Sequence, residues 1–284
     1  MIKRKRRIKK RNREKIDINI INILILMKLI ISNDNGRATT FYNIFNNLKQ
    51  FSDTVRLNFN NDGLYVQGMD QAHILLYEFN LTPEWFSEYT IDNPITIGVN
   101  SIVFSNVLGF HTANQQIILT YISNIDKIHI EFNGADTISK KTSLSLVDIT
   151  SELLTIPSHD SQTDFSINIK AFSDFIDQLN IFNANATIVC NEEYIKLIAN
   201  GLEGSMEVPI PIDSLEEFAI DEDTTVESTY ALNMLKKMCS FHKLTNVVNI
   251  EVSNNYPFKM SYDIGDNSIV KFYLAPKIDD DDDE

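Results

Sequence analysis

The chain has 284 residues, 43% of them hydrophobic, and its 17 Phe and 10 Tyr against 9 Gly and 7 Pro predict an ordered globular body. Cys190 and Cys239 are the only cysteines, which excludes a disulfide framework or a cysteine-rich zinc site and favours a reducing compartment. Residues 1–26 hold ten of the 25 Lys and Arg and two of the 39 acids, so residues 27–284 carry a net charge of −22. So acidic a body repels DNA at long range, and it can hold DNA only through a local basic surface or by enclosure.

The amino-terminal stretch combines a basic segment, KRKRRIKKRNR at residues 3–13, with an Ile- and Leu-rich run up to residue 31. This order resembles a signal anchor, but polar residues such as Asp17 and Asn22 interrupt the run, which is too short to span a bilayer comfortably. We therefore expect no membrane association. The alternatives are a nuclear-localisation or nucleic-acid-binding arm, translation from Met27, and a disordered extension over residues 1–26, which we favour.

In chain order, the first pattern is a helical stripe over residues 41–51, where apolar residues recur at spacings of three and four. Strand-like runs follow at residues 55–59, 64–69 and 74–79. The sequence Asn-Asp-Gly at residues 61–63 predicts a tight turn between the first two, because glycine tolerates a positive φ. A second helix is predicted to open at Asn100 and to end near His111, ahead of the strands IILTYI and KIHIEF.

The second half repeats this order, which indicates an internal duplication. A helical stripe over residues 172–179 precedes short strands at residues 186–190, 194–199 and 206–210. A further helix opens at Leu232 and ends near His242, followed by VVNIEV and FKMSYDI. We therefore predict an α+β fold of two duplicated domains with antiparallel sheets. The predicted boundaries are a basic extension over 1–26, domains over 27–144 and 164–278, a connector over 145–163 and an acidic tail over 279–284.

No catalytic pattern is present in the sequence. It contains no nucleophile elbow, phosphate-binding loop, dinucleotide fingerprint or zinc-protease motif, and the acidic runs lack calcium-loop spacing. His111 and His242 occupy equivalent repeat positions near helix ends, where capping or a solvated face is the expected role. We predict that the protein is not an enzyme and uses no metal or cofactor.

Three segments resemble the proliferating cell nuclear antigen family of DNA sliding clamps. They are KFYLAPKIDDDDDE at residues 271–284, DGLYVQGMDQAHILL at 62–76 and ITIGVN at 95–100, and weaker matches such as LTIP at 154–157 connect them. The resemblance implies a DNA-clamp fold in which three identical chains close head-to-tail into a ring, with sheets outside and helices lining a hole for duplex DNA. It also implies service to a replicative DNA polymerase and a clamp loader, in the nucleus or at a viral replication site.

Partners of this family insert a short peptide, with one aliphatic and two aromatic anchors, into a hydrophobic pocket under the connector. An apolar cleft with a polar rim suits such anchors, with an affinity on the order of micromolar. The resemblance assigns this pocket to Met69, His73, Ile74, Leu76, Leu154, Ile156, Pro157, Pro257, Tyr273, Leu274, Ala275, Pro276 and Lys277. On the hole-lining helices, the basic residues are Arg37, Lys49, Lys170, Lys236, Lys237 and Lys243.

The sequence also departs from the family. The helix at residues 100–111 has no Lys or Arg, and Asp174 and Asp177 stand where the family commonly carries arginines. The strands that would join subunits lie at residues 142–147 and 205–212, and Pro209 and Pro211 remove hydrogen-bond donors from one edge of the second. Glu192 appears in place of the family's modifiable lysine. These departures leave two alternatives, a subunit of a heterotrimeric checkpoint-like clamp and a clamp-like regulator that does not encircle DNA.

Overall fold

The structure, a computed structural model, describes residues 25–123, 125–149 and 152–277. Its first half contains β1 (Ile25–Ile31), α2 (Arg37–Leu48), β2 (Thr54–Asn60), β3 (Gly63–Met69), β4 (Leu75–Leu81), β5 (Glu88–Ile91), β6 (Ile95–Asn100), α3 (Ser101–Leu108), β7 (Gln116–Ile122), β8 (Lys127–Asn133) and β9 (Lys140–Ser145). Its second half contains β10 (Thr163–Asn168), α4 (Ile169–Leu179), β11 (Asn185–Cys190), β12 (Tyr194–Gly201), β13 (Gly204–Pro211), β14 (Glu217–Ile220), β15 (Val226–Ala231), α5 (Leu232–Cys239), β16 (Val247–Val252), β17 (Phe258–Asp263) and β18 (Ile269–Leu274). The two halves have the same order of helices and strands, which confirms the predicted duplication.

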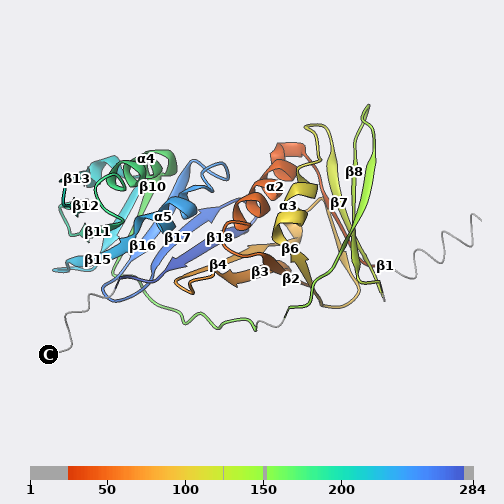
Figure 1. The fold of residues 1–284 in the computed structure, drawn as a ribbon, viewed down its shortest axis with the longest axis horizontal. Coiled ribbons are helices and arrows are strands. Elements are labelled where there is room, and N and C mark those ends of the chain that lie inside the picture. The colour runs from red at the N-terminus through yellow and green to blue at the C-terminus, as the bar shows by residue number, and fades with distance from the viewer. Residues whose placement is uncertain (1–24, 124, 150–151, 278–284) are drawn as a thin grey trace, which may run out of the picture.

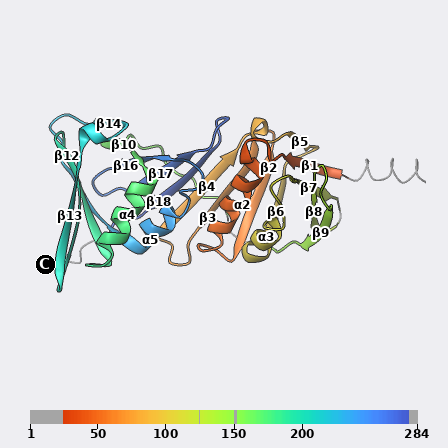
Figure 2. The same cartoon turned by 90° about the horizontal axis from the view of Figure 1, so that it is seen from above.

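The strands in the part of the chain that the structure describes form three antiparallel sheets. A five-stranded sheet has the order β5-β1-β7-β8-β9, and a four-stranded sheet has the order β13-β12-β11-β15. Between them, a nine-stranded sheet has the order β14-β10-β16-β17-β18-β4-β3-β2-β6 and crosses from one domain to the other at the β4–β18 pair. Figure 2 shows the five- and four-stranded sheets at opposite ends of the molecule.

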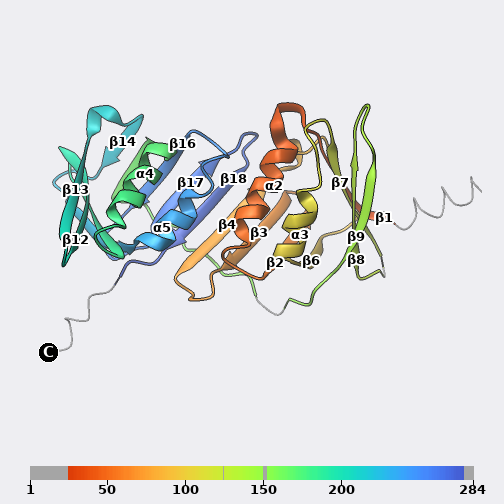
Figure 3. The ribbon, with the colours of Figure 1, turned by 45° about the horizontal axis from the view of Figure 1, so that its top comes forward.

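The four α-helices of the described residues cover one face of the nine-stranded sheet and lie in a row across it (Figure 3). The connector between the domains runs along the opposite face (Figure 1). Each helix buries its apolar stripe on the sheet: in α2, Phe41, Ile44, Phe45 and Leu48 are at most 1% exposed. The core is therefore enclosed between the helices and the sheets, and the outer face of the large sheet is left for the connector.

Local sequence signals explain where several elements begin. The Asn100 side chain accepts a hydrogen bond from the Val103 amide (2.9 Å) and so caps α3, and Asn168 caps α4 in the same way. Gly63, the first residue of β3 after the turn from β2, has a φ of +122°, and a Cβ there would lie 2.0 Å from the Leu81 carbonyl oxygen. The predicted turn thus requires glycine both for its backbone conformation and for the close approach of β4.

The observed boundaries differ slightly from the predicted ones. β1 begins at Ile25, two residues inside the predicted extension, because Ile25 pairs with Ile122 of β7. β10 begins at Thr163, the last residue of the predicted connector. The expectations for residues 1–24 and for the acidic tail lie outside the described residues. Within residues 25–123, 125–149 and 152–277, no helix is long and apolar enough to cross a membrane.

Candidate functional site

The outer face of the β4–β18 junction brings predicted pocket residues from both domains into one row. Leu76 of β4 lies opposite Met69 of β3 on one side and opposite Tyr273 of β18 on the other. Because side chains alternate between the two faces of a strand, these three residues share the face under the connector. The pairing of two domains in one sheet thus creates the floor of the site.

The connector is attached to this face by specific hydrogen bonds. At its start, the Val147 amide donates to the Gly98 carbonyl (3.0 Å), and a Cβ on Gly98 would lie 2.3 Å from the Val147 oxygen. Near its middle, the backbone of Leu154 makes two bonds with the Gln67 side chain, at 2.7 and 2.9 Å. Further on, the ring of His159 stacks on Tyr256 with 3.7 Å between centroids. The connector therefore packs against the sheet along much of its length.

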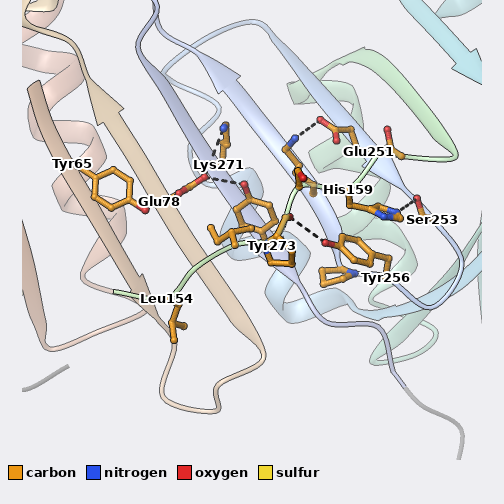
Figure 4. Close-up of a pocket in the computed structure, with 15 residues that line it drawn as sticks. Tyr65, Glu78, Leu154, His159, Glu251, Ser253, Tyr256, Lys271 and Tyr273 are labelled. Atoms are coloured by element: carbon orange, nitrogen blue, oxygen red, sulfur yellow. Dashed lines mark hydrogen bonds and ion pairs between the residues drawn. The ribbon is translucent and has the colours of Figure 1, made fainter. Parts of the chain in front are cut away.

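Two cavities lie against the connector, each of about 420 Å³, and Leu154 lines both. The first, shown in Figure 4, is bordered by the predicted residues Leu154, Ile156, Pro157, Pro257 and Tyr273. The second is bordered by the predicted residues Met69, His73 and Leu154. The structure thus brings most of the predicted pocket together, but as two adjoining hollows.

Of the predicted residues that line neither cavity, all but one are tied to neighbouring segments or partly exposed. The Ala275 amide donates to the Ile74 carbonyl (2.9 Å), which ties the carboxyl-terminal segment to the 70–74 loop, and the Lys277 amide donates to the Thr229 carbonyl (2.8 Å). Leu76 and Pro276 are partly exposed in the same region. Leu274 is the exception, because alternation along β18 turns its side chain into the core, where it is fully buried. The Leu274 side chain therefore cannot line the pocket, and the predicted role of Leu274 in peptide binding would have to rest on its backbone.

A buried carboxylate shapes the loop beside the second cavity. Asp70 is 5% exposed, and its carboxylate accepts hydrogen bonds from the amides of Ala72 (3.1 Å), Ile74 (2.9 Å) and Leu75 (2.8 Å). These bonds hold His73 in the left-handed region, with a φ of 59°. His73 and Ile74 are therefore presented at the rim by a rigid loop.

Sequence reasoning missed the polar residues that share the floor. Tyr65, Gln67, Glu78 and Lys271 stand two or four positions from predicted residues on the same strands, and the period of two was the signal that pointed to them. Glu78 accepts hydrogen bonds from two tyrosine hydroxyls, Tyr65 at 2.8 Å and Tyr273 at 2.9 Å. Burial and the neighbouring Glu78 raise the pKa of both tyrosines above the ordinary value, so both hydroxyls remain protonated donors at neutral pH.

The surface formed by the four helices is poor in uncommitted positive charge. Arg37 pairs with Asp266 and donates to the carbonyls of Glu84 and Trp85, so its guanidinium is committed to the protein itself. Lys236 forms an ion pair with Asp177 (2.7 Å). The positive charges of these two predicted DNA-facing residues are therefore partly neutralised by neighbouring carboxylates.

The other predicted cations vary in their surroundings. The Lys49 ammonium donates to the Asn46 side chain (2.8 Å), and that of Lys237 lies 5.9 Å from the centre of the Phe51 ring. Lys170 and Lys243 are exposed. Ile102 and Val103 of α3 are each nearly half exposed, so this helix presents apolar side chains where the others present polar ones. Such a surface can make a few phosphate contacts, but it cannot attract DNA strongly.

The described residues offer no metal site. Among them, no cluster of three or more His, Cys, Asp or Glu side chains has the arrangement that a metal ion requires. The histidines at the helix ends act locally instead: Nδ1 of His111 lies 2.8 Å from the Leu108 carbonyl oxygen, and Nδ1 of His242 lies 3.2 Å from that of Cys239. Each ring therefore satisfies a carbonyl in the last turn of its own helix, as expected from the sequence.

Comparisons with known proteins assign both halves of the chain. Residues 32–153 match the proliferating cell nuclear antigen, N-terminal domain, and residues 155–277 match its C-terminal domain. The proliferating cell nuclear antigen of Chaetomium thermophilum is 28% identical over 256 residues, which cover 86% of this chain and 97% of the relative. That of Saccharomyces cerevisiae is 26% identical (86% and 96% covered), as is proliferating cell nuclear antigen 1 of Plasmodium falciparum (87% and 96%). The chain therefore belongs to the proliferating cell nuclear antigen family.

Proposed function

We propose that this protein is a DNA sliding clamp, a non-catalytic ring of three identical chains that encircles duplex DNA in the nucleus and tethers a replicative polymerase and other partners to it. Family membership supports the sliding-clamp role itself. The observation that carries the ring is the duplicated topology, because it leaves one matching pair of strand edges open at the two ends of the chain.

The duplication makes β4 the counterpart of β13 and β9 the counterpart of β18. Within the chain, β4 and β18 pair over six residues, from Leu75 opposite Leu274 to Asn80 opposite Ile269. The counterparts β9 and β13 each have a neighbour on one side only and lie at opposite ends of the molecule (Figure 2). Pairing β9 of one copy with β13 of the next would repeat the internal junction, and repetition of one such head-to-tail contact closes a ring.

The prolines of β13 lie on its open edge. Gly201 and Gly204 pair across a two-residue turn, and alternate residues from Gly204 onward direct their backbone groups toward β12. Pro209 and Pro211 belong to the other set, which faces the neighbouring copy. The proposed interface therefore lacks two backbone donors, each worth about 1 kcal/mol net, and we expect it to open more readily than a full ladder.

We further propose that partners dock through the two cavities beside the connector. An aliphatic anchor and two aromatic anchors of a partner peptide would fill the apolar parts bordered by Met69, Ile156 and Tyr273. Exposed backbone groups and Lys277 would make polar contacts with the peptide around these parts. The helix surface would face the DNA. Because several of its cations are internally paired, encirclement and not affinity would hold the duplex.

A topological experiment tests this proposal. The protein is threaded onto bead-tethered linear DNA through the free end, the end is then blocked with a bulky protein, and the beads are washed in high salt. We expect retention that is lost when a restriction enzyme cuts the DNA, because only a closed ring is released by a new end. Release by the high-salt wash from end-blocked DNA would refute encirclement, since salt alone removes a protein held by charge.

A heterotrimeric clamp is the second candidate, and the two edge prolines together with the depleted basic lining favour it. In that case this chain alone would remain monomeric and would thread onto the DNA only with other subunits. Retention by the chain alone would exclude the requirement for them.

A further inference from the structure

The polar residues under the connector form a continuous hydrogen-bonded relay between the two walls of the proposed peptide pocket. At one end, Gln67 bonds the backbone of Leu154, accepting from its amide (2.7 Å) and donating to its carbonyl (2.9 Å). The same Gln67 amide group donates to the Tyr65 hydroxyl (3.0 Å). The connector is thereby linked to a tyrosine on β3 of the amino-terminal domain.

From Tyr65 the relay continues across the domain junction. The Tyr65 hydroxyl donates to one carboxylate oxygen of Glu78 (2.8 Å), and the Tyr273 hydroxyl donates to the other (2.9 Å). Figure 4 shows Glu78 between the two tyrosines. Tyr273 is on β18 of the carboxyl-terminal domain, and its ring borders the first cavity. The relay therefore connects the connector wall to the aromatic wall, although these come from different domains.

The direction of the bonds makes Glu78 the centre of the relay. Donors from both sides point toward its carboxylate, which can only accept, and Tyr65 can bond Gln67 and Glu78 together because it accepts from one and donates to the other. The Glu78 side chain is 16% exposed, and Lys271 lies 3.7 Å away. A carboxylate with this little solvent is stable because two hydroxyls and a nearby cation compensate its charge.

We propose that Tyr65, Gln67 and Glu78 are positioning residues that preform the partner-binding pocket, by fixing the Leu154 segment of the connector and the Tyr273 ring before any peptide arrives. The inference rests on the proposed function, because it gives the relay a role in that same pocket. Connector residues 152–155 are themselves exposed, so they gain little rigidity from burial, and the bonds to Gln67 are their anchorage. A preformed wall spares the peptide the entropic cost of ordering it.

The test uses three conservative substitutions in the full-length protein. Tyr65→Phe and Tyr273→Phe each remove one oxygen atom and keep the ring, and Glu78→Gln keeps the shape but places a donor opposite one of the hydroxyls. Tyr89→Phe is the matched control, because it removes a half-buried hydroxyl that donates to the Asn60 carbonyl (2.7 Å) outside the relay. A fluorescein-labelled synthetic peptide with one aliphatic and two aromatic anchors is the probe for affinity. Hydrogen exchange at the Leu154 amide reports on the connector without a peptide.

We expect Tyr65→Phe and Glu78→Gln to accelerate exchange at Leu154 and to raise the Kd of the peptide about five- to tenfold, as for loss of a charge-assisted hydrogen bond. Tyr89→Phe should change neither. The effects of Tyr65→Phe and Tyr273→Phe should be non-additive in the double variant, because both act through Glu78. A role in stability alone would not produce this coupling in the peptide Kd.

The outcomes separate this inference from the proposed function. If the unmodified protein binds the peptide and Tyr65→Phe changes neither Kd nor exchange, the relay has no positioning role. Faster exchange with an unchanged Kd would also overturn the inference. A connector that is loosened before binding would then cost the peptide no affinity. If the unmodified protein fails to bind the peptide, the proposed pocket is refuted, and unchanged exchange in the variants would refute the connector anchorage as well.

Discussion

The β4–β18 junction can be compared with the open edges of β9 and β13, because the duplication makes β13 the counterpart of β4 and β9 the counterpart of β18. The junction strands read LLYEFNL and IVKFYL, and their inward residues are buried in the core. The open edges read KKTSLS and GSMEVPIP, with polar residues and two prolines. The same topology therefore carries a permanent contact inside the chain and, in the proposed ring, would carry a reversible contact between copies. The proposed ring would have to open to admit DNA, and a weaker contact between copies would favour that opening.

The largest effect should follow from a substitution inside the junction. Phe272 of β18 is fully buried, and its ring lies 4.8 Å from Phe241 and 5.8 Å from Phe51. Phe272→Ala should lower the free energy of unfolding by about 3–5 kcal/mol, because it leaves a cavity in the core. Urea unfolding followed by tryptophan fluorescence or circular dichroism measures this loss. Leu144→Ala, at the half-buried position on β9, should cost much less, and equal losses would contradict the comparison.

The next effect concerns the donors that are missing from β13. Pro209→Val combined with Pro211→Val would restore two backbone N–H groups per proposed interface, each worth about 1 kcal/mol. We expect the assembly to survive greater dilution, measured by analytical ultracentrifugation. Pro94→Val is the control, because exposed Pro94 lies in the loop between β5 and β6, away from either edge. Unchanged association would show that this edge does not join copies of the chain.

Removal of a backbone donor from β9 should weaken the association of copies, by less than the β13 substitutions strengthen it. The Leu146 amide bonds the Asp126 carbonyl and the Val147 amide bonds Gly98, so alternation directs the Ser143 amide to the open side. Ser143→Pro should weaken each proposed interface by about 1 kcal/mol and leave the folded monomer intact. Thr142→Pro, which removes a donor facing β8, should instead destabilise the monomer. Thermal unfolding and sedimentation together distinguish the two outcomes.

The smallest expected effect is a change in Tm from a substitution on the outer face of the large sheet, away from the junction. Asp164 of β10 is opposite Glu251 of β16, and burial, Glu251 and Glu217 raise its pKa. A raised folded-state pKa means that stability is lost as the pH rises through that value. Asp164→Asn should therefore raise the Tm slightly near neutral pH, and the gain should vanish in acid, where Asp164 is protonated. A gain that persists in acid would rule out the carboxylate's charge as the cause.

The sequence predicted the duplication, the helices and most strands because apolar periodicity and turn residues are local signals. Asn100 and Gly63 act through their own backbone neighbourhood, so their roles were readable in advance. The core-facing direction of the Leu274 side chain could not be read from the motif match, because such a match gives positions and not the direction of side chains along a strand. The relay through Glu78 could not be predicted, since its members come from three strands and the connector, and Tyr273 reaches Glu78 only when the two domains pair.

The solution mass of the full-length protein, measured by size-exclusion chromatography with light scattering over a dilution series, tests the central claim most directly. The pairing of β9 with β13 between copies predicts a species of three times the chain mass at micromolar concentrations, which dissociates on dilution without unfolding. A single-chain mass at every concentration would contradict the self-closing ring and would leave the two alternatives, a subunit of a heterotrimeric clamp and a regulator that does not encircle DNA.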